Sequence, residues 1–192
     1  MIKIYYLDIT NRRDIELSEF PKNVRDFLHN YKEKKSKKLS MYSWLFLMQI
    51  LYKNYGIKLE EKKIIKNQYG KPYVDGIYFN ISHSNNMIAI AISDKEVGID
   101  IESESNLKKH LDSEYYLGWL NKEEIGEFNK TYNKLNYLTR AWTKKEAILK
   151  SKGKGINNYI ELKNVEGNVS VYQIKDKKNE KYLISVTNSC YL

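Results

Sequence analysis

Hydrophobic residues recur with two different periods along the chain, and the changes of period divide it into predicted strands and helices. Residues 1–9 alternate apolar and polar side chains, as a half-buried strand does. From about residue 18 to residue 55 the spacing is helical, and Gly56 follows as a good C-cap. Residues 39–52 of this block are apolar on nearly every face, which predicts a buried central helix.

The middle of the chain has the period of strands. Residues 63–74 predict a short strand and then a turn through Gly70, Lys71 and Pro72. Three strand-like runs follow in close succession, with the sequences "IYFNIS", "MIAIAIS" and "VGIDIE". Residues 93–96 join the last two runs, and we expect them to form a β-hairpin.

Helical spacing returns in the second half of the chain. One block covers residues 108–129, and within it Asn121 and Glu124 have the spacing of a capping box. A further helix runs to about Lys152, and residues 160–190 then predict strands with turns. The order of strand, helices, strands, helices and strands favours an α+β protein with two lobes that meet near residues 93–98.

Composition narrows the class of protein. The chain has 192 residues, 42% hydrophobic and 30% charged, which is enough for a well-packed core and argues against extensive disorder. The longest apolar-rich run, residues 44–52, is too short to span a bilayer, and the first ten residues lack the layout of a signal peptide. The single cysteine, Cys190, excludes an intrachain disulfide framework. We therefore expect a cytoplasmic protein that does not insert into membranes.

The formal net charge of +9 indicates partners that are anionic: nucleic acid, phosphorylated small molecules or an acidic protein. The excess is concentrated in residues 22–38 and residues 144–155. The more frequent explanation of such clusters is a solvated helix face, so charge alone does not identify the partner.

Asp100 and Glu102 are the first candidate site. On a strand their side chains share one face about 7 Å apart, so we expect a cation between them. Ligands that are all oxygen indicate a hard cation such as Mg²⁺, which also binds phosphate oxygens. The alternative is an exposed strand edge with two ordinary acids.

Glu146 and Lys150 are the second candidate site, four residues apart on one face of a predicted helix. The alternative is an exposed ion pair worth a few tenths of a kcal/mol. Trp142 lies on the same stripe and favours a packed position, so this face suits the wall of a site. Glu146 would complete a set of three carboxylates, and Lys150 would neutralise a phosphate.

Two turns complete the candidate chemistry. "FNISHS" ends in hydroxyls and an imidazole, His83, which suit phosphate oxygens. "YGKP" holds Lys71 in a tight turn, where a lysine acts as a fixed point charge for phosphate. Each turn has the alternative of a purely structural role. Taken together, the candidate sites indicate phosphate chemistry.

The motifs "GKP", "FNISHS", "GIDIE" and "WTKKEAILKSKGKGI", in this order and spacing, resemble the 4′-phosphopantetheinyl transferase superfamily, specifically its Sfp type. They cover residues 70–156. The resemblance implies two similar α/β lobes related by a pseudo-two-fold axis, with the active site between them. We place the N-terminal lobe at residues 1–96 and the C-terminal lobe at residues 97–192.

The resemblance also implies an activity: transfer of 4′-phosphopantetheine from coenzyme A to a serine of an apo carrier protein, with release of 3′,5′-ADP. It implies Mg²⁺ as cofactor, an acidic acyl or peptidyl carrier protein as partner, and a monomer. No nucleic acid or membrane is expected as partner. The implied magnesium ligands are Asp100, Glu102 and Glu146. The implied catalytic residues are Glu146 and Lys150. The implied coenzyme A contacts are Lys71, Pro72, Ser82, His83 and Lys150.

Further roles follow from the same resemblance. Trp142 is expected to buttress its helix, and Gly98 is expected to leave space for the ligand beside the strand. The family often has an arginine for the 3′-phosphate of coenzyme A, but the corresponding region here, "KKLSMYSWLFL", contains none. The candidate replacements are Lys37, Lys38 and Ser40, or Lys32, Lys34 and Lys35.

Two other functions remain open from the residues. A Mg²⁺-dependent phosphohydrolase or nuclease acting on nucleotide-like substrates would use the same three carboxylates. A non-catalytic nucleic-acid-binding protein would explain the positive charge alone, with binding that weakens as salt is added.

Overall fold

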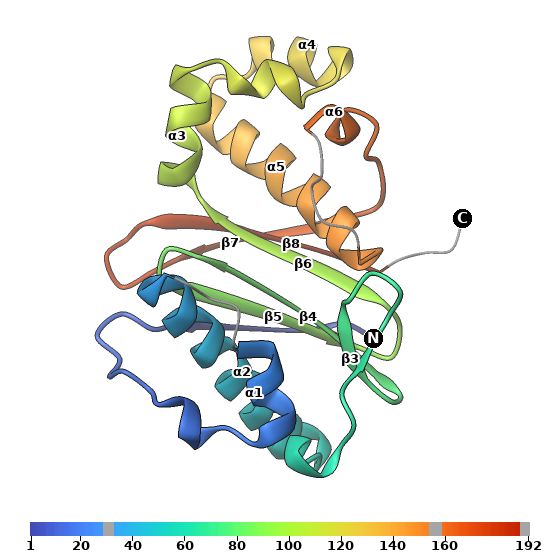
Figure 1. The fold of residues 1–192 in the computed structure, drawn as a ribbon. Coiled ribbons are helices and arrows are strands. Elements are labelled where there is room, and N and C mark those ends of the chain that lie inside the picture. The colour runs from blue at the N-terminus through green and yellow to red at the C-terminus, as the bar shows by residue number, and fades with distance from the viewer. Residues whose placement is uncertain (29–32, 154–158, 189–192) are drawn as a thin grey trace.

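The computed structural model describes residues 1–28, 33–153 and 159–188, and it shows two stacked β-sheets with helices on both outer faces (Figure 1). The strands are β1 (Lys3–Asp8), β2 (Ile65–Lys66), β3 (Pro72–Val74), β4 (Ile77–Ser84), β5 (Met87–Ser93), β6 (Val97–Ser103), β7 (Ser170–Lys175) and β8 (Lys181–Asn188). The α-helices are α1 (Lys22–Leu28), α2 (Lys34–Tyr55), α3 (Glu104–Asp112), α4 (Lys122–Lys130), α5 (Lys134–Ser151) and α6 (Tyr159–Leu162). Short 3₁₀ helices cover Leu17–Glu19, Leu59–Glu61 and Tyr115–Gly118.

The first sheet has the strand order β1-β5-β4-β3-β2 and is antiparallel throughout. β5, between β1 and β4, is buried along its whole length. Alternate side chains of a strand point to opposite faces, so one set packs against α2 and the other against the second sheet. The set toward α2 is Ile88, Ile90 and Ile92. The set toward the second sheet is Met87, Ala89 and Ala91.

The second sheet has the order β6-β8-β7, also antiparallel, and α5 covers its outer face (Figure 1). The β-hairpin expected between "MIAIAIS" and "VGIDIE" is wrong. β6 pairs with β8, from Val97 opposite Asn188 to Ser103 opposite Tyr182. The reason is that β1 and β4 already occupy both edges of β5, so the chain crosses after Ser93 to the other sheet.

Most helix boundaries agree with the local signals. α2 ends at Tyr55, and Gly56 adopts the left-handed conformation with φ 65°. Asn121 caps α4, because its side chain accepts from the Glu124 amide and the Glu124 carboxylate accepts from the Asn121 amide, both at 2.8 Å. The predicted block 108–129 is divided between α3, a 3₁₀ turn and α4. The tail forms β7 and β8 as predicted, and Cys190 lies outside the described residues.

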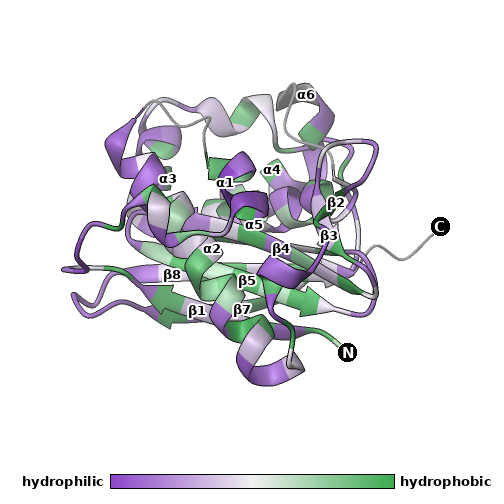
Figure 2. Ribbon diagram, turned by 60° about the horizontal axis from the view of Figure 1, so that its bottom comes forward, coloured by the Kyte–Doolittle hydropathy of each residue, from purple (hydrophilic) through white to green (hydrophobic). Residues whose placement is uncertain are grey.

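The predicted α+β class is confirmed. Hydrophobic residues lie on strands and helices alike, while the peripheral loops are mostly hydrophilic (Figure 2). Each sheet has one long helix against its outer face, α2 for the first and α5 for the second (Figure 1). The pseudo-two-fold relation and the boundary at residue 96 stay predictions. Among the described helices, none combines the length and apolar character needed to cross a bilayer.

Candidate active site

β4 and β6 belong to different sheets, yet side chains of β4 bond to the backbone of β6. The three residues involved alternate along "FNISHS", so they share the face of the first sheet that looks toward the second. The bonds run from Ile99 N to Asn80 Oδ1 (2.9 Å), from Ile101 N to Ser82 Oγ (3.4 Å) and from Ser103 N to Ser84 Oγ (3.1 Å). Polar side chains thus take the place of a neighbouring strand's carbonyls, and they fix β6 against β4.

Asp100 lies at the centre of this junction. Its side chain is buried, and Oδ1 accepts from Ser82 Oγ at 2.7 Å and from Lys150 Nζ at 2.6 Å. Lys150 Nζ also donates to Ser82 Oγ at 3.0 Å. The ammonium group of Lys150, on α5, is therefore a cationic partner of Asp100, and the Mg²⁺ expected between Asp100 and Glu102 stays a prediction. Burial lowers the pKa of Lys150, but the charges of Asp100, Glu146 and Glu102 more than compensate, so the net shift is upward.

Glu102 is fixed by three donors. Its Oε1 accepts from Asn106 Nδ2 at 2.7 Å, from the Ser103 amide at 2.9 Å and from the Ser84 hydroxyl. Burial raises the pKa of Glu102 above its usual value, although the bonds from Ser84 and Asn106 act in the opposite direction. Asn106, in the first turn of α3, was not singled out from the sequence. The sequence gave no signal for this contact, because Glu102 ends a strand and Asn106 begins a helix, and the turn between them brings them together.

Glu146 faces the same group of charges from α5. Burial raises its pKa to about 7, Lys150 acts against that rise, and the negative charges of Asp100 and Glu102 add to it. Lys150 pairs with Asp100 rather than forming an exposed pair on its own helix. On the same stripe, Trp142 packs edge-on against Trp119, with ring centroids 5.2 Å apart. This packing supports the buttressing role expected of Trp142.

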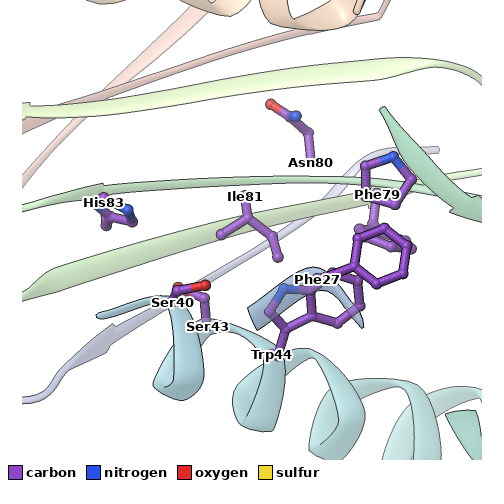
Figure 3. A pocket seen from close by; sticks show the side chains of 9 residues that line it. Phe27, Ser40, Ser43, Trp44, Phe79, Asn80, Ile81 and His83 are labelled. Carbon is purple, nitrogen blue, oxygen red and sulfur yellow. The ribbon is translucent and has the colours of Figure 1, made fainter. Parts of the chain in front are cut away.

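A pocket of about 250 Å³ lies on the other face of β4, between that strand and α2 (Figure 3). Its wall contains the aromatic side chains Phe27, Trp44 and Phe79, together with Ser40, Ser43, Pro72, Asn80, Ile81 and His83. Two predicted contacts, Pro72 and His83, therefore lie in one pocket. The three rings also pack against one another, with centroids 4.9 Å apart for Phe27 and Trp44 and 6.0 Å apart for Trp44 and Phe79. The sequence offered no sign of the aromatic wall, because α2 and β4 are brought together only by the fold.

Ser82 and His83 are neighbours in sequence but serve opposite faces of β4. Ser82 bonds to Asp100 and Lys150 at the junction, whereas His83 lines the pocket. The pKa of His83 is lowered by the protein atoms around the imidazole and by the positive charge of Lys150, although the side chain keeps contact with solvent. The imidazole is therefore neutral at physiological pH and offers one donor and one acceptor. β4 links the pocket to the charged junction.

Comparison with known proteins agrees with this geometry. Residues 96–190 match the 4′-phosphopantetheinyl transferase superfamily. The chain is 31% identical over 163 residues to the 4′-phosphopantetheinyl transferase gsp of Aneurinibacillus migulanus, a match that covers 81% of this chain and 68% of that relative. This chain belongs to the 4′-phosphopantetheinyl transferase superfamily. It is also 22% identical over 148 residues to the 4′-phosphopantetheinyl transferase Sfp of Bacillus subtilis, with 72% of this chain and 64% of that relative covered. Both relatives support the Sfp-like type.

The three carboxylates at the junction could hold a metal ion. Asp100 Oδ2 is buried and has no hydrogen-bond partner among the described residues, so it is available to a cation. Asp100, Glu102 and Glu146 offer only oxygen donors, which fit a hard ion. Within the described ranges, no group of three or more His, Cys, Asp or Glu side chains forms a ready-made metal site. The three carboxylates are therefore of the donor type that Mg²⁺ prefers. The Lys150 ammonium already lies beside one of them, Asp100.

The residues proposed to replace the family's arginine lie in different places in the structure. Ser40 lines the pocket. Lys38 instead donates to Arg12 O at 2.6 Å and to Asp14 Oδ1 at 2.9 Å, and a second hollow contains Lys34 and Lys37 with Asp14. Lys32 lies outside the described residues. Of these candidates, Ser40 is the one that the described pocket includes.

Lys71 has two acceptors within the protein. Its Nζ donates to Val97 O at 2.6 Å and to Ser151 O at 3.1 Å, and its side chain is not part of the pocket wall. The predicted contact between this ammonium group and coenzyme A stays a prediction. What the structure shows is a link from the first sheet to β6 and to the end of α5.

The role expected of Gly98, space for a ligand, is wrong. A Cβ at this position would lie 1.9 Å from Ala147 O and 2.4 Å from Ser151 N, so the backbone of α5 occupies that space. The glycine is needed because helix and strand approach each other more closely than any side chain permits. Gly98 therefore sets the distance between the element that carries Lys150 and the element that carries Asp100.

Proposed function

We propose that this protein transfers 4′-phosphopantetheine from coenzyme A to a serine hydroxyl of an apo carrier protein, with Mg²⁺ as cofactor. The observation that carries the proposal is the position of the half-buried Lys150–Asp100 pair, which lies across β4 from the pocket of about 250 Å³. Pro72 and His83 line that pocket, so the adenine nucleotide would bind there. Its diphosphate would then lie near Lys150.

The chain's own residues have distinct tasks in the proposed reaction. The serine Oγ attacks the β-phosphorus of the diphosphate, a P–O bond to the leaving 3′,5′-ADP breaks, and the serine proton passes to a base. Glu146 is the proposed base, because its carboxyl group faces the same charged junction as Lys150 and Asp100. The Lys150 ammonium offsets negative charge on the diphosphate. Positioning and electrostatics supply most of the rate in such displacements.

Asp100, Glu102 and Glu146 would hold the magnesium ion in this proposal. When bound, such an ion neutralises charge that develops on the leaving diphosphate oxygen. The support in this chain is the unpaired Asp100 Oδ2 and the fixed orientation of Glu102 by Asn106 and the Ser103 amide.

The proposed carrier is acidic, because a net charge of +9 favours encounter with an anionic partner. We also propose a cytoplasmic monomer.

The test is an incubation of the protein with coenzyme A, Mg²⁺ and a panel of apo carrier proteins, followed by intact-mass measurement of each carrier. We expect one carrier to gain the mass of one phosphopantetheine, and we expect EDTA, or replacement of the carrier's acceptor serine by alanine, to prevent the gain. A gain that persists in EDTA would refute the magnesium requirement alone. Release of phosphate from coenzyme A without any carrier would favour the alternative, a Mg²⁺-dependent phosphohydrolase.

A further inference from the structure

We infer that Lys71 is a positioning residue: its ammonium ties the last turn of α5 to the start of β6 and so sets the geometry of the Lys150–Asp100 pair. The catalytic consequence rests on the proposed function, whereas the tie itself rests on geometry. Lys71 Nζ donates to Val97 O at 2.6 Å and to Ser151 O at 3.1 Å. Ser151 directly follows Lys150, and Val97 precedes Asp100 by three residues.

The Ser151 carbonyl is a group that needs a partner. Ser151 is the last residue of α5, and the final carbonyls of an α-helix have no donor within the helix. Those carbonyls also form the negative end of the helix dipole, where a cation is favoured. Val97 O is at the first residue of β6. One ammonium group therefore satisfies a helix end and a strand start at the same time.

Lys71 is presented rigidly from the first sheet. Asn67 Oδ1 accepts from the amides of Tyr69 (2.9 Å) and Lys71 (3.0 Å), and the Asn67 amide donates to Lys71 O at 3.0 Å. The same turn packs against the chain beyond α5, since a Cβ at Gly153 would lie 2.8 Å from Asn67 Nδ2. The contact between this turn and the end of α5 therefore involves more than one lysine side chain.

The tie is adjacent to the closest contact between α5 and β6. Gly98 fits against Ala147 O and Ser151 N, which fixes how near the helix and strand can come. Lys71 bonds the residues on either side of that contact, Val97 and Ser151. Removal of the ammonium would free the last helical turn, and Lys150 would lose its fixed 2.6 Å approach to Asp100.

Two carbonyl acceptors hold the Lys71 ammonium in place, although burial works against its charge. Burial lowers its pKa to about 8, and the negative charge of Glu96 offsets part of that effect. A contact with a phosphate of coenzyme A would require the ammonium to leave its two carbonyls. A positioning role and a substrate-contact role therefore predict different kinetic changes when the ammonium is removed.

The kinetic test compares Lys71→Met with Lys63→Met, a control at an exposed lysine of the same segment. We expect Lys71→Met to lower kcat by about tenfold while KM and the calorimetric Kd for coenzyme A stay within about twofold of wild type. Lys71→Arg, which keeps a charged donor, should recover part of kcat. A tenfold weaker Kd with unchanged kcat would overturn the inference in favour of a direct phosphate contact.

Hydrogen exchange tests the tie without any turnover. Amides of residues 147–152 should exchange faster in Lys71→Met than in wild type or Lys63→Met, because the end of α5 opens more often. Unchanged exchange and unchanged kcat together would overturn the inference. If the wild type transfers no phosphopantetheine, the proposed function fails, and the exchange comparison still decides the role of Lys71. If Lys71→Met does not fold, Lys71→Gln is measured in the same way.

Discussion

Asn106 Nδ2 lies 2.7 Å from Glu102 Oε1, and this bond links the first turn of α3 to the end of β6. The same carboxylate oxygen accepts from Ser84 on the first sheet. Glu102 is therefore oriented from two sides, by its own sheet's following helix and by the opposite sheet. In the proposed function, this fixed orientation would prepare Glu102 to bind Mg²⁺.

Replacement of Asn106 should weaken the use of magnesium. We expect Asn106→Ala to raise the half-saturating Mg²⁺ concentration by about tenfold, because Glu102 would lose a donor that fixes its orientation. Titration of transferase activity with MgCl₂ measures this value. Asn129→Ala, at an exposed position of α4, is the control and should match wild type. An unchanged magnesium dependence in Asn106→Ala would contradict the assignment of Glu102.

The charge of Asp100 should be indispensable. Asp100→Asn keeps the shape of the side chain but leaves the Lys150 ammonium without its anionic partner at 2.6 Å. We expect kcat to fall by about 100-fold or more. Asp112→Asn, at an exposed position of α3, should retain full activity. Circular dichroism would check that both variants fold. A folded Asp100→Asn with half of the wild-type rate would refute the proposed centre.

Two glycines should respond in opposite directions to the same substitution. Gly98→Ala places a methyl group 1.9 Å from Ala147 O, so the free energy of unfolding should fall by about 3 kcal/mol or more. Gly126 lies within α4, where an added Cβ meets nothing within 4 Å. Gly126→Ala should therefore raise the free energy of unfolding by about 0.5–1 kcal/mol. Urea unfolding of the two variants measures both values, and a tolerated Gly98→Ala would contradict the close packing of α5.

The stability of the protein should change with pH through Lys71. Its pKa is about 8 in the folded protein, below the ordinary value of 10.5. Between these two values the unfolded chain still binds the proton that the folded protein has lost, so stability rises with pH in this window. Urea unfolding at pH 7.5 and pH 9.5 should show a larger gain for wild type than for Lys71→Met. Equal gains would mean that Lys71 titrates normally.

Local signals in the sequence were sufficient for many elements. Alternation predicted β4, β5 and β6, and the capping box at Asn121 marked the start of α4. These signals depend only on a few neighbouring residues. The predicted strands and the cap are therefore present in the described structure. The hairpin expected after β5 failed because strand pairing depends on which sheet edges are free, and that is a property of the whole fold.

By itself, the sequence determined the element order, the α+β class and the acidic and basic residues that gather at the junction: Asp100, Glu102, Glu146 and Lys150. It could not determine their partners. Lys150 reaches Asp100 across 50 residues, Lys71 reaches Ser151 across 80, and the pocket wall combines α2 with β4. Those contacts arise because burial of two apolar sheet faces brings β4, β6 and α5 together. Only the tertiary structure therefore decided that Lys150 lies beside Asp100 and that Gly98 makes room for a helix.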